Sequence, residues 1–189
     1  QEPRSRKVVT GIVMSSYPWE HDAFKHMLEG VTRQHFFEEF HENKSLHSLH
    51  DDPKRYSDLL SIDRIDEVIA NSELPPEALR MARSEPSITR SNYTFSNGNI
   101  DRGAVVRHYQ QGATIILPQL HLADEVLAHF CRALEKIFST HVQTNIYLTP
   151  PNNKGFDTHY DDHDVFVMQI SGKKNWKLYR KPIENPYRG

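Results

Sequence analysis

The chain has 189 residues, enough for one domain with its own core, and its 37% hydrophobic and 25% charged residues are ordinary for a globular protein. The formal net charge of -2 offers no basic field for nucleic acid, and no apolar run approaches the ~20 residues of a membrane span. The single cysteine, Cys131, excludes an internal disulfide and favours a reducing, cytoplasmic location.

The N-terminal half of the sequence predicts helices. Residues 8–14 (VVTGIVM) suit an added edge strand, and from Trp19 to about Ala70 the pattern is helical. Thr32 and Ser61 are predicted N-caps. The helices that follow these caps carry apolar residues at helical spacing: Phe36, Phe37 and Phe40 in the first, and Ile62, Ile65, Val68 and Ile69 in the second.

The C-terminal half predicts mainly strands. Residues 112–120 (GATIILPQL) form a short strand stopped near Pro118, and residues 141–151 form another, closed by two prolines. Two further strands are expected at 164–170 (DVFVMQI) and 175–180 (NWKLYR), joined by the turn SGKK. Between the first two strands, residues 121–138 predict an amphipathic helix with one apolar face: Leu122, Val126, Leu127, Phe130, Leu134, Ile137 and Phe138. The fold class is therefore α+β, with an antiparallel sheet or barrel.

Six of the eight residues from 157 to 164 are His or Asp, and an apolar segment follows at once. In an extended chain His159 and Asp161 point to the same side, as does His163, whereas Asp162 and Asp164 point to the other. An imidazole and a carboxylate are two thirds of the triad that holds Fe(II) in non-haem oxygenases. From the residues alone, a solvated acidic turn with a hydrogen-bonded histidine is the preferred interpretation, because a His-x-Asp match occurs by chance in many proteins.

The run TNIYLTPPNNKGFDTHYDDHDVFVMQISGKKNWKLY closely resembles the Jumonji-C-type cupins of the ribosomal oxygenase group. FFEEFHENKSLHSLHDDPKRYSDLLSIDRIDEVI is similar to the helical signature of that group, and GATIILPQLH to its first core strand. The resemblance covers about residue 33 to the end. It implies N-terminal helices (about 33–95) followed by a double-stranded β-helix (about 103–189), with residues 1–32 as a leader segment.

The resemblance also implies a set of site residues. His159 and Asp161 match the first two iron ligands, and Lys174 matches the basic residue that binds the distal carboxylate of 2-oxoglutarate. Asn145 and Tyr147 match polar residues that line the co-substrate pocket. From the residues alone, Lys174 could equally be a solvated hairpin lysine, the role that suits Lys173, and Asn145 and Tyr147 could serve ordinary cross-strand packing.

One expected ligand has no match. The group has a second histidine several strands after the His-x-Asp pair, whereas the last histidine of this sequence is His163. The predicted strands are also too few to close a barrel, so we expect the sequence to be a fragment of a longer protein. The alternatives are a shortened homologue that binds metal poorly, or a site completed by His163, His108 or His121.

The expected function is that of an Fe(II)- and 2-oxoglutarate-dependent dioxygenase that hydroxylates a side chain of a protein, with a ribosomal protein among the candidate substrates. The alternatives are a non-catalytic cupin that acts as a scaffold or binding module, a cupin-type hydroxylase of a small molecule, and a cupin-type metal hydrolase. Beyond the metal ligands no catalytic residue is predicted, and no membrane or direct nucleic-acid partner is expected. Because related proteins are often dimers, the resemblance also allows a homodimer.

Overall fold

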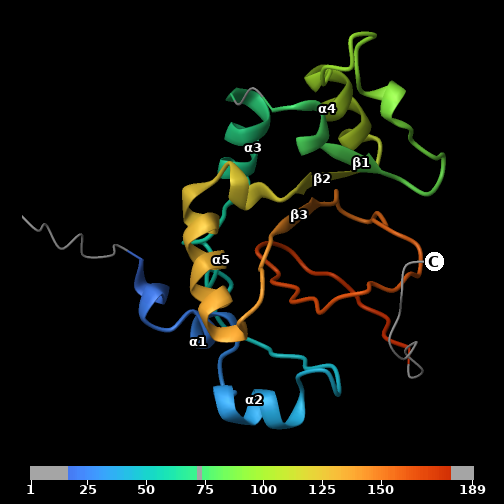
Figure 1. The fold of residues 1–189 in the computed structure, drawn as a ribbon. Helices are drawn as coiled ribbons and strands as arrows, with labels where there is room; N and C mark the ends of the chain where they lie inside the picture. Colours follow the sequence, from blue (N-terminus) through green and yellow to red (C-terminus); the bar gives the residue numbers. More distant parts are fainter. Residues whose placement is uncertain (1–16, 72–73, 180–189) are drawn as a thin grey trace, which may run out of the picture.

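A computed structural model describes residues 17–71 and 74–179 of the chain (Figure 1). The α-helices in this part are Ala23–Met27 (α1), Arg33–Glu39 (α2), Ile62–Asn71 (α3), Arg102–Gln110 (α4) and Glu125–Phe138 (α5). The strands are Arg80–Ala82 (β1), Thr114–Pro118 (β2) and Asn145–Leu148 (β3). Four short 3-10 helices complete the order: Pro18–His21 (η1), Pro76–Ala78 (η2), Arg90–Asn92 (η3) and Leu120–Leu122 (η4).

Helices α2 and α3 begin at the predicted N-caps. The hydroxyl of Thr32 accepts a hydrogen bond from the backbone N–H of His35, and that of Ser61 accepts one from Arg64. Each bond satisfies a donor that the first turn of a helix leaves free, so both predicted caps are confirmed.

The prediction of helix throughout residues 19–70 is wrong for the interval between α2 and α3. Pro53 lies in this interval and has no N–H to donate to a helix. The side chains of Arg55 and Tyr56 instead hydrogen-bond the backbone carbonyls of His26 and Met27 in α1, at 3.0 and 2.9 Å. The interval therefore folds back on α1.

The predicted amphipathic helix is confirmed as α5, although it begins four residues later than expected. Asp124 is its N-cap and accepts a hydrogen bond from the N–H of Leu127. Leu122 was predicted to lie on the apolar face, but it falls in η4 and is 75% exposed. The buried face of α5 packs in the same core as η1 and α1, and it consists of Leu127, Phe130, Cys131 and Leu134.

The three strands form one antiparallel sheet in the order β1-β2-β3, so the predicted strands at 112–120 and 141–151 are confirmed as β2 and β3. Ile115 pairs with Leu148 and Leu117 with Ile146. These four side chains form the apolar face of the sheet, because paired residues share a face and successive residues alternate. The opposite face is therefore free to carry polar residues.

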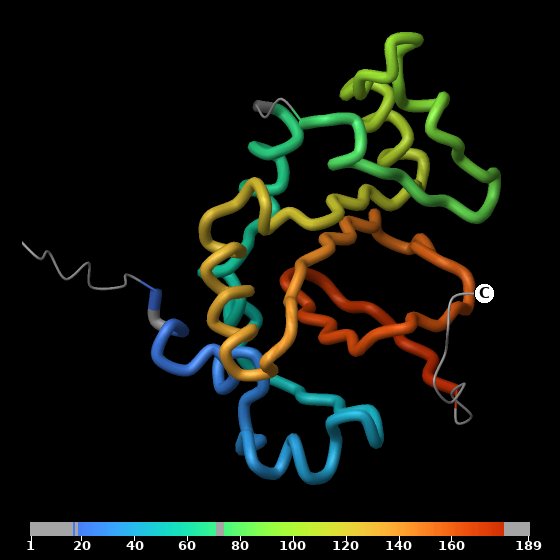
Figure 2. Tube along the Cα trace, viewed as in Figure 1, coloured from blue at the N-terminus to red at the C-terminus, as the bar shows by residue number. Residues whose placement is uncertain are grey.

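The strands expected at 164–170 and 175–180 are not formed as strands in the described residues. Figure 2 shows this part of the chain doubling back below β3, and Gly172 at the bend has a φ of +72°. The expectation failed because alternating apolar residues describe only one strand, whereas a ladder needs a partner at the right register. Val165 and Val167 accordingly remain about half exposed.

The edge strand expected at residues 8–14 lies outside the described residues. Helix α4 occupies residues 102–110, where the barrel strands were expected to begin. Within the described residues, none of the helices combines the length and apolar character needed to cross a membrane.

Candidate metal and co-substrate site

The face of the sheet that points away from the core carries polar side chains. Tyr147 pairs with Ile116 and Asn145 with Pro118, so these residues share this face. By the same alternation, Thr114 and Thr149 lie at its end, and their hydroxyl oxygens are 2.9 Å apart. The predicted common face of Asn145 and Tyr147 is thus present in the fold.

The side chain of Asn145 also hydrogen-bonds to the backbone just after β2. Its Oδ1 accepts a hydrogen bond of 3.1 Å from the N–H of Gln119, a residue in the left-handed region with a φ of +52°. The side-chain amide nitrogen of Asn145 remains as a donor toward the polar face.

His159 has the orientation that a metal ligand requires. Its Nδ1 lies 2.8 Å from the backbone carbonyl oxygen of Asp157. A carbonyl can only accept, so Nδ1 carries the hydrogen and the neutral ring keeps a lone pair on Nε2. Ligating histidines are typically held in this way, with the second ring nitrogen bonded to a carbonyl or carboxylate.

Phe156 connects His159 to the sheet. Its ring contacts the rings of Tyr147 and His159, with centroids 5.4 and 5.8 Å apart. The pKa of the Tyr147 hydroxyl lies above its ordinary value, first because the ring is partly buried and second because of the negative charge of Asp161. Phe156 therefore links His159 to Tyr147, and Asp161 is near enough to Tyr147 for its charge to affect that hydroxyl.

Lys174 reaches the other end of the same face. A Cβ placed on Gly155 would lie 3.9 Å from its Nζ, 3.4 Å from Thr114 Oγ1 and 3.5 Å from Thr149 Oγ1. The ammonium group of Lys174 also lies over the ring of Trp176, 5.0 Å from its centroid. Gly155 directly precedes Phe156, so Lys174 and His159 each lie close to one of two adjacent residues.

None of the three histidines considered as an unusual third ligand is placed with His159 in a potential metal site. His163 contacts Asp162 at 3.1 Å, and His108 Nε2 lies 3.1 Å from a backbone carbonyl oxygen. His121 is buried and accepts at Nδ1 from the N–H of Thr144. Its pKa is lowered chiefly by that burial and further by the nearby side chains of Arg132 and His141.

Among residues 17–71 and 74–179, one group of three side chains has ligand atoms close enough to share a metal ion. It consists of His41, Glu42 and Asp164, whose ligand atoms lie within 4.8 Å of one another. His41 Nε2 and Asp164 Oδ2 are 3.7 Å apart. The group contains neither His159 nor Asp161, which therefore stand as a pair in the described part of the chain.

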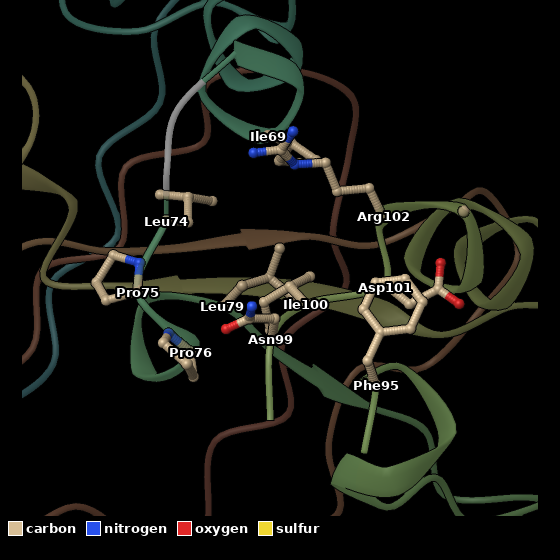
Figure 3. A pocket seen from close by; sticks show the side chains of 11 residues that line it. Ile69, Leu74, Pro75, Pro76, Leu79, Phe95, Asn99, Ile100, Asp101 and Arg102 are labelled. Atoms are coloured by element: carbon tan, nitrogen blue, oxygen red, sulfur yellow. The ribbon is translucent and has the colours of Figure 1, made fainter. Parts of the chain in front are cut away.

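A separate cavity of about 670 Å³ lies away from these residues (Figure 3). None of the predicted site residues lines it. Its wall is mostly apolar, Arg102 extends toward Ile69, and Asp101 is engaged as the N-cap of α4. The candidate site rests on the polar sheet face, not on this cavity.

Thr114, Thr149 and Gly155 were missed by sequence reasoning. Thr149 follows Tyr147 by two residues and Thr114 precedes Ile116 by two, so alternation alone would have placed both threonines on the polar face. The position of Gly155 depends on how the chain returns under the sheet, and the sequence carries no local signal for that.

Parts of the chain are similar to known proteins. Residues 115–188 match the family model described as JmjC domain. The chain is 33% identical over 161 residues to the bifunctional lysine-specific demethylase and histidyl-hydroxylase NO66 of Drosophila grimshawi, covering 84% of this chain and 22% of that protein. The protein of the same name from Culex quinquefasciatus is 33% identical over 151 residues, 79% of this chain and 23% of that protein. The one from Drosophila yakuba is 30% identical over 167 residues, 82% of this chain and 23% of that protein. The chain spans less than a quarter of the length of each.

Proposed function

Residues 115–188 carry the sequence of a JmjC-type cupin oxygenase, and from that premise we propose that the protein is an Fe(II)- and 2-oxoglutarate-dependent oxygenase that hydroxylates a side chain of a protein substrate. The observation that supports this proposal is that Phe156, whose ring contacts both Tyr147 and His159, follows Gly155, near which Lys174 Nζ lies; we propose that His159 and Asp161 bind the metal there and that Lys174 binds a carboxylate. A scaffold that binds no co-substrate has no need for a lysine that binds a carboxylate at this position.

The residues present fit an iron ion as a partial ligand set. His159 would bind through Nε2, which the carbonyl of Asp157 leaves free, and Asp161 would bind through a carboxylate oxygen. A complete triad requires one more donor, and the described residues place none beside this pair. When bound, iron with 2-oxoglutarate and oxygen supplies the oxidising chemistry. The task of the chain is to orient the ligands.

The residues also fit 2-oxoglutarate. Lys174 supplies a positive charge beside two hydroxyl groups, and Gly155 leaves the space between them open. A charge-assisted bond from an ammonium group is stronger than a neutral one, so Lys174 would fix the distal end of the co-substrate. Tyr147 and Asn145 would line the path from that end to the metal.

The printed names of the relatives guide the choice of substrate. They describe a lysine-specific demethylase and histidyl-hydroxylase, so histidine and N-methyl-lysine side chains are the substrates we propose to test first. A ribosomal protein is the candidate target that the sequence resemblance suggests, and the cytoplasm is the proposed location.

The direct experiment incubates the full-length protein with Fe(II), 2-oxoglutarate, oxygen and a panel of histidine- and methyl-lysine-containing peptides. We expect oxygen-dependent succinate formation and a mass change on one class of peptide. Lys174→Ala should raise the 2-oxoglutarate concentration needed for half-maximal turnover by about tenfold or more, because it removes a hydrogen bond to a charged group. The matched control is Lys173→Ala, which should behave as wild type. Absence of both turnover and iron binding would overturn the proposal.

The isolated His–Asp pair also favours a second candidate, a cupin that serves as a scaffold without catalysis. Titration of the full-length protein with Mn(II), which takes the place of iron without redox chemistry, separates the two. A saturable site lost in His159→Ala supports the enzyme, and the absence of any such site supports the scaffold.

A further inference from the structure

The carboxylate of Asp164 meets a histidine just beyond the end of α2. Its Oδ2 lies 3.7 Å from Nε2 of His41, whose backbone N–H still bonds to the carbonyl of Phe36 in the helix. The next residue, Glu42, brings a third donor, and the ligand atoms of the three side chains all lie within 4.8 Å of one another. One imidazole and two carboxylates from distant parts of the sequence therefore converge.

Aromatic rings hold two of these three donors in place. The half-buried ring of His41 contacts three other rings, with centroids 5.2 to 6.5 Å apart: Phe36, Phe37 and Phe138. Phe166, two residues after Asp164, contacts two of the same rings, those of Phe36 and Phe138. The imidazole and the backbone that carries the carboxylate are thus anchored to one cluster, so little freedom remains to be lost when they bind an ion.

The spacing of the donors suits an ion better than a direct bond. A hydrogen bond between nitrogen and oxygen is about 2.7 to 3.2 Å long, so the 3.7 Å between His41 Nε2 and Asp164 Oδ2 is too long for one. Two ligands held about 2.1 Å from a tetrahedral zinc ion are about 3.4 Å apart, close to the observed distance. Glu42 is exposed, so its carboxylate is free to approach the same ion.

The donor types indicate which cation these residues would bind. Zinc accepts histidine nitrogen and carboxylate oxygen together, and with three protein ligands a water molecule completes its coordination. Calcium and magnesium prefer oxygen ligands alone, so the imidazole of His41 disfavours them. The backbone of Glu42 has a φ of +55°, in the left-handed region that favours glycine, yet the residue here is a potential ligand.

We propose that His41, Glu42 and Asp164 bind a zinc ion, at a site separate from the proposed iron ligands. The ion connects the end of α2 to the segment that directly follows His159 and Asp161, and its role is structural. The inference goes beyond the proposed function and does not depend on it, since a scaffold without catalysis could hold the same ion.

Zinc binding to the full-length protein tests the assignment. The titration uses His159→Ala, which removes a proposed iron ligand, and calorimetry follows the binding of zinc chloride. We expect a zinc site that persists in this variant. Adding His41→Ala should weaken that site by more than about 100-fold, because losing a ligand costs more than losing a residue that only supports one. Adding His35→Ala, which removes a histidine of α2 outside the group, should leave zinc binding unchanged. Excess magnesium should not compete.

Glu42→Gly separates the loss of a ligand from a failure to fold. Glycine adopts the left-handed backbone without strain, so this variant should unfold at a temperature at least as high as the parent protein when no zinc is present. Zinc should raise the unfolding temperature of the parent, because the ion binds the folded state, but should not raise that of Glu42→Gly. Circular dichroism measures both. If the variant with His41→Ala does not fold, Glu42→Gly decides the question.

Two results would show that the three residues form a surface ion pair and nothing more. One is the absence of a zinc site in His159→Ala, and the other is a zinc site unaffected by both His41→Ala and Glu42→Gly. Either result overturns this inference and leaves the proposed function intact. Conversely, a failure of the wild-type protein to turn over 2-oxoglutarate or bind iron overturns the proposed function and leaves the zinc site standing.

Discussion

A backbone carbonyl, not a side chain, orients the ring of His159. The carbonyl of Asp157 receives the Nδ1 hydrogen, while the carboxylate of Asp157 is occupied elsewhere, by Lys154 at 2.6 Å. That contact with Lys154, through a hydrogen bond and charge, lowers the pKa of the Asp157 carboxyl group. The carboxylate of Asp157 is therefore not needed to hold the ring of His159.

This separation predicts different effects for neighbouring aspartates. His159→Ala and Asp161→Ala should each weaken Mn(II) binding by more than about 100-fold. Replacing residues that only hydrogen-bond to metal ligands already lowers metal affinity by about 10- to 100-fold, and removing a ligand should lower it more. Asp157→Ala should bind Mn(II) nearly as the wild type does, since its backbone carbonyl remains. Titration monitored by electron paramagnetic resonance measures all three. A loss in Asp157→Ala as large as that in Asp161→Ala would show that Asp157 is itself a ligand.

The buried thiol of Cys131 should make the stability of the fold depend on pH. Burial raises the pKa of its thiol to about 11, and the side chain has no exposed surface. The folded protein should therefore resist iodoacetamide at pH 8, whereas the guanidinium-unfolded chain should be alkylated, as mass spectrometry can show. Above the ordinary thiol pKa the unfolded state loses this proton and the folded state keeps it, so stability should fall as pH rises from about 9 to about 11. Cys131→Ala should show a smaller decline, and an identical decline would contradict the assignment.

At the scale of elements, one buried carboxylate joins two helices. Asp124 Oδ1 caps α5 through the N–H of Leu127, and its Oδ2 accepts a hydrogen bond of 3.0 Å from Arg64 Nε in α3. Asp101 caps α4 in the same way but does so at a more exposed position. The two aspartates thus share the capping function and differ in the connection to another helix.

This difference predicts unequal costs for the same substitution. Asp101→Ala should lower the free energy of unfolding by about 1 kcal/mol, the typical value of an N-cap. Asp124→Ala should lower it by about 2 to 3 kcal/mol, because the bond to Arg64 is lost as well. Urea denaturation followed by circular dichroism measures both. Equal costs would mean that the link between α3 and α5 adds nothing to stability.

The elements that sequence reasoning placed correctly are those with local signals. Caps at Thr32 and Ser61 mark helix starts; a proline as the last residue of β2 and two prolines soon after β3 mark strand ends. Residues 164–170 have an equally clear alternation, yet they form no ladder because pairing depends on a distant partner. For the site, spacing in the sequence yielded His159 and Asp161 as a pair, and resemblance pointed to Lys174. The contribution of Gly155 arises only when separate segments meet.

At the scale of the whole molecule, an aromatic cluster joins the C-terminal segment to the helices. The ring of Phe166 contacts Phe36 of α2 and Phe138 of α5, with centroids 5.8 and 5.3 Å apart. Nearby, Asp164 contacts His41 at 3.7 Å. These contacts hold the segment that directly follows His159 and Asp161, so the helical half of the chain helps to place the proposed metal ligands.

Removing one ring should loosen that connection. Phe166→Ala should lower the free energy of unfolding by about 1 to 2 kcal/mol, from lost apolar burial and ring contacts. It should also speed hydrogen exchange in residues 156–170 and weaken Mn(II) binding, while β2 and α5 stay protected. Val165→Ala is the control, because this neighbouring side chain is 54% exposed and should matter little. Uniform acceleration across the molecule would show general destabilisation instead of a local anchor.

The alternation in β2 and β3 has a consequence for how this chain tolerates variation. Ile115 and Leu117 face the core, whereas Thr114 lies on the polar face, where we propose that 2-oxoglutarate binds. A saturation library across β2, sorted once for abundance in cells and once for activity, should give two interleaved profiles with a period of two residues. Positions 115 and 117 should limit abundance, and position 114 should limit activity in variants that accumulate normally. A single short strand thereby separates the selection for folding from the selection for chemistry, one residue at a time.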